Sequence, residues 1–301
     1  MVTDGGDDSL AASGLHRMEL DEAGANPERI AAAIHNAIGD CPGPVPVQDI
    51  ARTLDIFDIR EQNLHGLEGA LVTSPERPDG LILVNRRSSR PRRRFTIAHE
   101  LGHFLMVHHV MVEATGFRCR NRDMGAASPG PKTSSEDRHL RQEAEANRFA
   151  IELLAPRPRL RPLLNRLPDL ARVLEISKTF AISKEAAARR YVELHHASLA
   201  VLFLHRGKVV YLHKGNDFPW LAIGKGQTLP GHAETRPGLS DIYDADPTDW
   251  LDRAGPLGLQ VQVLGQEGDR AIVLLHADTL ADPDDDPEID DTFDRFTQGR
   301  R

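Results

Sequence analysis

The chain has 301 residues, of which 40% are hydrophobic and 27% are charged, a composition that excludes a wholly disordered or fibrous protein. Its net charge of −8 argues against a dedicated nucleic-acid binder, which usually carries a basic domain. There is no apolar run long enough for a transmembrane helix, and the acidic N-terminus lacks the features of a signal peptide. Two cysteines, Cys41 and Cys119, are too few for a disulfide framework, so we expect a cytoplasmic protein without membrane contact.

The N-terminal part is predicted to contain helices followed by a hairpin. Residues 1–25 read as a flexible leader, and a helix over 26–39 has Asn26 as its N-cap and Pro27 at its first position. The apolar spacing of VQDIARTLDI indicates a second helix. Two apolar strands, LEGALVTS and GLILVNR, flank a turn rich in Pro and Asp, which favours an antiparallel hairpin.

The rest of the chain is predicted to alternate between helices and loops before it becomes β-rich. Pro91 marks the start of an apolar helix, residues 110–137 read as a long loop, and a helix returns over 138–154. Two helices around a short turn at 181–183 follow, with Ser183 capping the second. Beyond them lie five short apolar runs, predicted to be strands: LAVLFLH, KVVYLHK, LAIG, VQVLG and AIVLLHA.

Two basic features invite a nucleic-acid interpretation that we do not favour. The helix pair has helix-turn-helix spacing, but the second helix, with Arg189 and Arg190, is alanine-rich and has few side chains suited to reading bases, so we favour a packing module. The arginine-rich segment 86–94 precedes the apolar helix. Arginines at a helix N-terminus oppose the helix dipole, so we expect carboxylates to hold them.

The strongest signal is the sequence His99-Glu100-Leu101-Gly102-His103. On a helix, His99 and His103 project from one face, one turn apart, and can ligate one Zn²⁺ ion. Glu100 is then placed to act as general base on a water that the metal activates. A glycine inside a helix is costly, so Gly102 suggests the close approach of a neighbouring element.

A catalytic zinc needs a third protein ligand, and the candidates are downstream carboxylates. Helix geometry selects Glu143, because it falls inside the apolar arc of the helix over 138–154, whereas Glu145 falls at the margin and Glu152 points away. Asn147, one turn later, is expected to hydrogen-bond a ligating imidazole. The carboxylates considered were Glu113, Asp123, Glu136, Asp137, Glu143, Glu145 and Glu152.

These motifs carry a family resemblance. FTIAHELGHFLMVHH followed by RQEAEANRFAIELLAP resembles the ImmA/IrrE family of bacterial metallopeptidases over roughly residues 30–200. The resemblance implies a gluzincin-like peptidase domain with His99, His103 and Glu143 as ligands, Glu100 as the catalytic glutamate, and cleavage of a helix-turn-helix repressor. The chain departs from the family pattern in the long insertion between the motifs and in Ala155-Pro156, where Met-Pro is common.

The predicted fold is α+β, a peptidase domain with a small antiparallel sheet followed by a helix-turn-helix-like segment and a small C-terminal α+β domain. Some family members carry a GAF-like domain at that position. The predicted boundaries are a leader at 1–25, the zinc peptidase domain at 26–160, the helical segment at 161–197, the β-rich domain at 198–277 and an acidic tail at 278–301.

The predicted function is zinc-dependent hydrolysis of a peptide bond in a protein, with Mn²⁺ as the alternative metal. The protein partner is expected to be a helix-turn-helix repressor of stress or mobile-element genes, and direct binding to nucleic acid is not expected. The rival interpretation is a non-catalytic DNA-binding or sensor protein with a structural metal. A structural site favours four protein ligands and needs no base, so Glu100 separates the two. The sequence assigns no oxyanion-stabilising residue, since nothing in it selects Tyr191, Tyr211 or Tyr243 for that role, and it leaves open whether Cys119 touches the metal.

Overall fold

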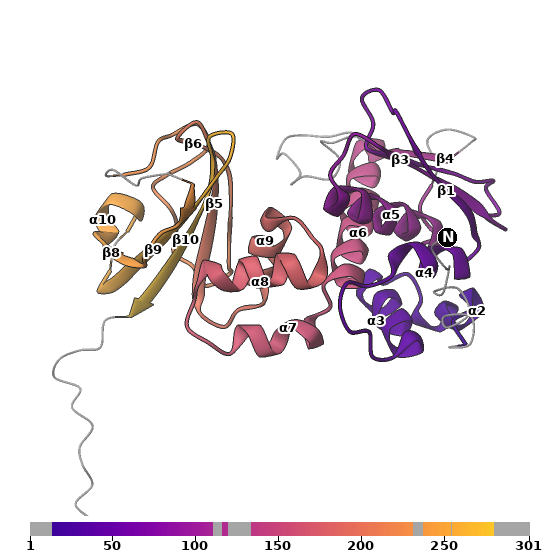
Figure 1. The fold of residues 1–301 in the computed structure, drawn as a ribbon, viewed down its shortest axis with the longest axis horizontal. Coiled ribbons are helices and arrows are strands. Elements are labelled where there is room, and N and C mark those ends of the chain that lie inside the picture. Colours follow the sequence, from indigo (N-terminus) through magenta and orange to yellow (C-terminus); the bar gives the residue numbers. More distant parts are fainter. Residues whose placement is uncertain (1–13, 111–115, 120–133, 231–236, 254, 280–301) are drawn as a thin grey trace, which may run out of the picture.

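The structure, a computed structural model, describes residues 14–110, 116–119, 134–230, 237–253 and 255–279. The N-terminal helices and their sheet lie at one end and a C-terminal sheet at the other, with three helices between them (Figure 1). The fold is therefore α+β, as predicted. Among the described residues, no helix is both long and apolar enough to cross a bilayer.

The first helices begin earlier than expected. Helices α2 (Arg17–Leu20) and η1 (Asp21–Ala23) lie in the segment predicted to be a flexible leader, and Leu15 is only 1% exposed. The prediction was therefore wrong from Leu15 onward. Helix α3 (Pro27–Ile38) starts as predicted, with the Asn26 side chain accepting a hydrogen bond from the amide of Arg29 at 2.8 Å.

The N-terminal sheet contains the predicted hairpin within a larger arrangement. Its strand order is β1-β3-β2-β4, with β2 (Gly69–Val72) antiparallel to both β3 (Gly80–Asn85) and β4 (Gly116–Cys119). Helix α4 (Val47–Thr53) ends before β1 (Ile56–Gln62), which pairs in parallel with β3, so the sheet is mixed and not purely antiparallel.

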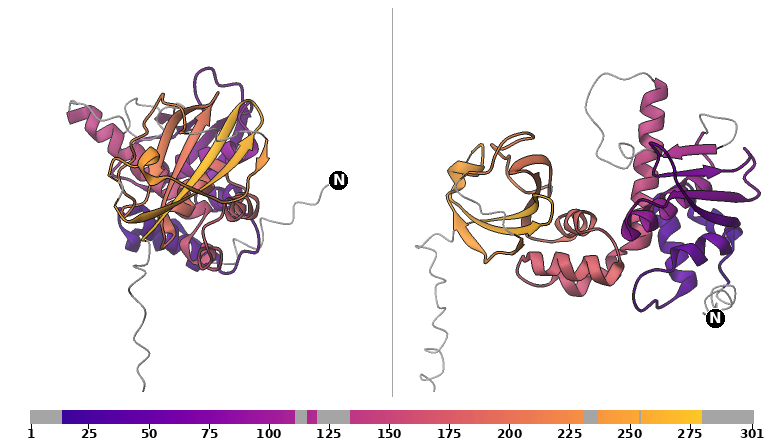
Figure 2. Two further views of the ribbon diagram at one scale, coloured as in Figure 1. Left: turned by 90° about the vertical axis from the view of Figure 1, so that its left-hand side faces the viewer. Right: turned by 45° about the horizontal axis from the view of Figure 1, so that its top comes forward.

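Two long helices beside this sheet contain the two motifs of the family resemblance. Helix α5 (Arg90–Leu105) contains both histidines, and α6 (Ser134–Leu154) packs against it. Figure 2 shows α6 running beside the sheet and extending past it. Residues 110–137 were predicted to be one long loop. That prediction was wrong at β4 and at the start of α6, and the remainder lies outside the described residues.

Three helices link the N-terminal part to the second sheet. Helix α7 (Arg157–Leu164) begins directly after Pro156, where the sequence predicted only the end of α6. Helices α8 (Leu170–Phe180) and α9 (Lys184–Leu194) form the predicted pair. Ser183 caps α9 as expected, with its hydroxyl accepting from the amide of Ala186 at 3.1 Å.

The second sheet has the order β6-β5-β10-β9-β7, with β8 pairing on β9. Four of the five predicted apolar runs lie in its long strands, whereas LAIG makes only an isolated bridge from Leu221 to Leu251. One sheet face joins the main core beneath α8 and α9, and the other has its own core around Trp250. The elements are β5 (Ser198–His205), β6 (Lys208–Lys214), β7 (Gly238–Leu239), β8 (Tyr243–Ala245), α10 (Pro247–Trp250), β9 (Leu257–Gln266) and β10 (Arg270–Thr279).

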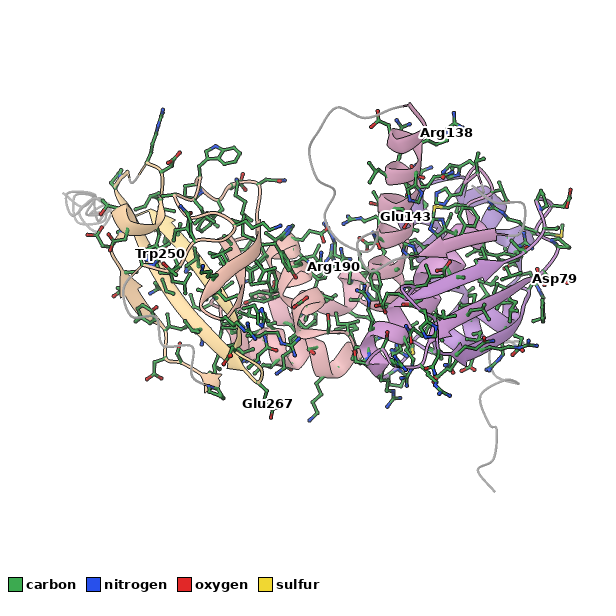
Figure 3. All side chains as sticks on the ribbon, turned by 90° about the horizontal axis from the view of Figure 1, so that it is seen from above. Asp79, Arg138, Glu143, Arg190, Trp250 and Glu267 are labelled. Atoms are coloured by element: carbon green, nitrogen blue, oxygen red, sulfur yellow. The ribbon has the colours of Figure 1, made fainter. Side chains whose placement is uncertain are left out.

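The basic features of the sequence are absorbed into the fold. Arg190 of α9 is buried and donates two hydrogen bonds to Glu152 of α6, at 2.9 and 2.5 Å. It lies between the two ends of the molecule (Figure 3). A buried arginine paired to a carboxylate is not available to DNA, which agrees with the packing interpretation of this helix pair. Arg92 and Arg93 pair with Glu68 and Glu61, so carboxylates do hold part of the arginine-rich segment.

Candidate metal centre

Three side chains that the sequence singled out lie on the inner part of α5. Thr96 and Ile97 lie one turn before them, and the whole stretch from Thr96 to Phe104 is buried. His99 and Glu100 are 0% exposed and His103 is 1% exposed. Buried polar groups need partners, so the surroundings of these three decide what the helix can do.

Glu143 supplies the partner for both histidines. Its two carboxylate oxygens lie 3.3 Å from His99 Nε2 and 3.2 Å from His103 Nε2, and the residue is 4% exposed. The two Nε2 atoms lie 3.1 Å apart. Figure 3 shows Glu143 on α6, on the side of the N-terminal sheet. The structure thus brings together the three proposed ligands, with donor atoms all within 4.8 Å of one another.

Gly102 makes this approach possible. A Cβ atom at that position would lie 2.9 Å from Phe149 Cδ1 and 3.4 Å from the Cα atom of Ala146, both on α6. Any larger residue would push the two helices apart, and α6 carries Glu143. The close contact that the sequence suggested for this glycine is therefore present.

The outer nitrogens of the imidazoles indicate their tautomers. His99 Nδ1 lies 3.0 Å from Asn147 Oδ1, as the sequence predicted for one ligand, and a carbonyl oxygen requires a proton on that nitrogen. The lone pair of His99 is then on Nε2, facing His103 and Glu143. Two imidazole lone pairs and a carboxylate directed at one point make a donor set that suits Zn²⁺.

Burial and the contacts between the side chains together set the electrostatics of the group. Burial lowers the pKa of His103 to about 4, so this imidazole is neutral, the form that binds metals. Burial alone would raise the pKa of Glu143, but its close contacts with His103 and His99 outweigh burial and hold that pKa well below its ordinary value. The carboxylate of Glu143 is thus ionised beside the neutral ring of His103.

Glu100 has a different environment. Burial, followed by the negative charge of Glu143, raises its pKa well above the ordinary value. Neither of its carboxylate oxygens has a hydrogen-bond partner within the described part of the chain. Gly69 of β2 lies over it, since a Cβ there would be 3.0 Å from Glu100 Oε1. An unpaired buried carboxylate next to a metal-type donor set is the feature expected of a base that acts on a bound substrate or water.

Other candidate carboxylates lie elsewhere. Glu152 pairs with Arg190, as its position opposite the apolar arc suggested. Glu145 contacts His108 and His109. Glu113 and Asp123 lie outside the described residues, and the side chains of Glu136 and Cys119 are likewise not described. Tyr191 accepts a hydrogen bond from the amide of Asp169 and Tyr211 donates one to Glu185, so neither contact places a tyrosine at this site.

Three further residues around the site were not predicted to belong to it. Helix α5 ends at Leu105 and the chain turns back, leaving His109 2% exposed with Nδ1 2.8 Å from His103 Nδ1. Glu145 lies behind it. Arg77 secures the turn by donating to the carbonyls of His103 at 2.9 Å and Met106 at 2.7 Å. Of these three, only His109 had a local sequence signal, because it forms a pair of adjacent histidines with His108 shortly after the motif.

Comparison with known proteins agrees with this geometry. Residues 57–191, from β1 to α9, match the family model of the IrrE N-terminal-like domain, Peptidase_M78. The match places an IrrE N-terminal-like domain at these residues and supports the resemblance to the ImmA/IrrE metallopeptidases. No curated protein matches the chain. Among solved structures, a Mycobacterium tuberculosis transcriptional regulator is similar over 90% of this chain and 93% of its own, with 12% sequence identity. The TM-score of 0.48 is too low to establish a shared fold.

Proposed function

We propose that this protein is a zinc-dependent endopeptidase that hydrolyses a peptide bond in a helix-turn-helix repressor and so derepresses stress or mobile-element genes. The observation that supports it is the meeting of His99, His103 and Glu143 beside the unpaired carboxylate of Glu100. The family match supports the peptidase part of the proposal. The assignment of a helix-turn-helix repressor as the substrate rests on the family resemblance of the motifs.

Each residue has a distinct task in this proposal. His99, His103 and Glu143 hold the metal, and Asn147 orients the ring of His99 through its Nδ1 proton. The chemistry that Zn²⁺ supplies when bound is that of a Lewis acid on the scissile carbonyl. Glu100 accepts the proton of the attacking water at its carboxylate and returns it to the leaving amine. Mn²⁺ is the alternative metal for the same donors.

The rest of the chain is assigned by its position. The C-terminal sheet, at the far end of the molecule from Glu143, is proposed to regulate the peptidase or select its substrate, as a GAF-like domain would (Figure 3). The reducing cytoplasm is the proposed setting, because a repressor substrate is found there and the cysteine content fits it.

The substitution Glu100→Gln tests the chemistry. The amide is nearly isosteric, so the fold and metal content should be retained, but it cannot accept the proton, and cleavage should fall by about 10²–10⁴-fold. Wild type and variant are each incubated with candidate helix-turn-helix repressors, with cleavage followed by mass and zinc measured in parallel. Glu175→Gln, on the exposed side of α8, is the matched control and should cleave normally.

Two results would count against the proposal. Undiminished cleavage by zinc-loaded Glu100→Gln would remove Glu100 from the mechanism. Absence of cleavage by the wild type, across several such repressors and with zinc or manganese supplied, would favour the non-catalytic sensor with a structural metal. A structural metal site favours four protein ligands, whereas the group found among the described residues has three.

A further inference from the structure

A second group of metal-type side chains lies directly behind the first. His108, His109 and Glu145 offer donor atoms within 4.8 Å of one another. Both histidines direct Nε2 at the same carboxylate oxygen, Glu145 Oε2, at 2.8 Å from His108 and 2.9 Å from His109. His109 also reaches His103 on its other side. The group is therefore either a second metal site or a support for the first.

The positions of the protons separate these two roles. If His103 binds a metal through Nε2, its Nδ1 carries a proton. That proton points at His109 Nδ1, 2.8 Å away, which must then be the acceptor. A neutral His109 that accepts at Nδ1 carries its own proton on Nε2 and donates it to Glu145. One set of tautomers thus satisfies every contact from Glu145 to His103.

A second metal ion is incompatible with this set of tautomers. A cation on His109 Nε2 would require the lone pair there and would move the proton of His109 to Nδ1. Two N–H groups would then face each other across 2.8 Å, between His103 and His109. The two sites cannot both be filled without the loss of a further proton, which is costly for a neutral imidazole. The geometry therefore favours one metal and a support for it.

The packing around His109 holds this arrangement in place. Phe117 of β4 stacks on the ring of His103, with centroids 4.5 Å apart, and meets the ring of His109 edge-on. The side chain of His109 is 0% exposed, whereas that of His108 is 39% exposed. Arg77 binds the carbonyl oxygen of His109 as well as that of His103, so both backbones are tied to one guanidinium.

We propose that Glu145 and His109 form an outer hydrogen-bond chain that orients the His103 imidazole and strengthens its donation to the metal. The proposal rests on the metal site proposed above. Glu145 and His109 are positioning residues in it, because they act on the metal only through His103. A carboxylate behind a ligating histidine commonly changes metal affinity by about 10- to 100-fold.

The test measures metal binding by the full-length chain. Glu145→Gln and His109→Leu should each weaken zinc binding about 10- to 100-fold in competition with a chelator, at an unchanged stoichiometry of one. They should also shift the visible absorption bands of the Co²⁺-loaded protein, which report on the ligand field. His109→Gln retains an acceptor for the His103 proton and should recover part of the affinity. Thermal unfolding checks that each variant is folded.

His108→Ala is the matched control, because His108 shares Glu145 but does not touch His103. It should bind one zinc with wild-type affinity and an unchanged cobalt spectrum. Two zinc ions on the wild type, reduced to one by His108→Ala, would replace the proposal with a second metal site. Unchanged zinc affinity and cobalt spectrum in both Glu145→Gln and His109→Leu would overturn the proposed hydrogen-bond chain but not the metal site. A wild type that binds neither metal would overturn the metal site with it.

Discussion

At the scale of single residues, the proposed metal site is tested most directly at Glu143, the carboxylate that completes the set of three ligands. Glu143→Ala should abolish stoichiometric zinc binding, because it removes one of three ligands and leaves only the two imidazoles, whose Nε2 atoms lie 3.1 Å apart. Metal content after dialysis measures it. Asp137→Ala, an exposed carboxylate on the same helix, should retain full occupancy. Full occupancy in Glu143→Ala would mean that the third ligand is wrong.

Gly69 is a second test at this scale, and it concerns Glu100. A Cβ on Gly69 would lie 2.2 Å from Thr96 Cγ2, so Gly69→Ala should destabilise the fold by about 1–3 kcal/mol through overpacking. Thr96→Ser removes that methyl group and should restore much of the stability in the double variant, as urea unfolding would show. Because the new Cβ still lies 3.0 Å from Glu100 Oε1, peptide hydrolysis should remain impaired. Full recovery of hydrolysis in the double variant would show that Glu100 does not need the space that Gly69 leaves beside its carboxylate.

At the scale of elements, the end of α5 depends on a residue from a distant loop. Arg77, which is 3% exposed, donates to the carbonyls of His103, Met106 and His109, at the end of α5 and in the turn that follows it. The carbonyl of Met106 also accepts from the amide of His109, so His103 and His109 depend most on Arg77. Each carbonyl left without a donor costs about 1–3 kcal/mol, so Arg77→Met should lower the free energy of unfolding by several kcal/mol. Denaturant unfolding measures this. Arg60→Met, at an exposed pair, should change it by less than about 0.5 kcal/mol, and an equal effect would refute the capping role.

The helices and strands also differ in how well the sequence alone predicts them. Helices α3 and α9 were predictable because their caps, Asn26 and Ser183, are local signals. The two histidines and Glu143 were predictable because helix periodicity fixes which face a side chain occupies. Strand β1 was missed because it is an edge strand with mostly exposed, charged side chains, and β4 because four residues in a polar loop become a strand only by pairing with β2. His109 was missed because Arg77, far away in the sequence, sets the turn that buries it.

At the scale of the whole molecule, the helix pair is tied to both ends. On one side Arg190 of α9 binds Glu152 of α6. On the other, Gln262 of β9 accepts a hydrogen bond from the amide of Leu170 at 2.6 Å and donates to Asp169 at 3.0 Å, so the second sheet caps the start of α8. A change in the C-terminal sheet thus has a continuous path of contacts to α6, which carries Glu143.

Truncation after Ala197 tests what this connection contributes. The proposed ligands all lie on α5 and α6, so the fragment 1–197 should still bind one zinc ion. It should nevertheless melt at a lower temperature and bind an apolar dye, because removal of the second sheet uncovers core residues of α8 and α9 such as Leu170 and Tyr191. Calorimetry and dye fluorescence on the fragment and the full chain measure both effects.

The outcome of that truncation separates two organisations of the chain. A fragment as stable as the full chain would mean that the predicted boundary near residue 197 divides two independent cores. A fragment that neither folds nor binds zinc would mean that the peptidase part cannot form without the second sheet. The intermediate result that we expect follows from the position of α8 and α9, whose apolar side chains share one core with α6 and with the inner face of β5. Loss of the sheet then loosens the helix pair first, and the salt bridge from Arg190 to Glu152 transmits that loosening to α6.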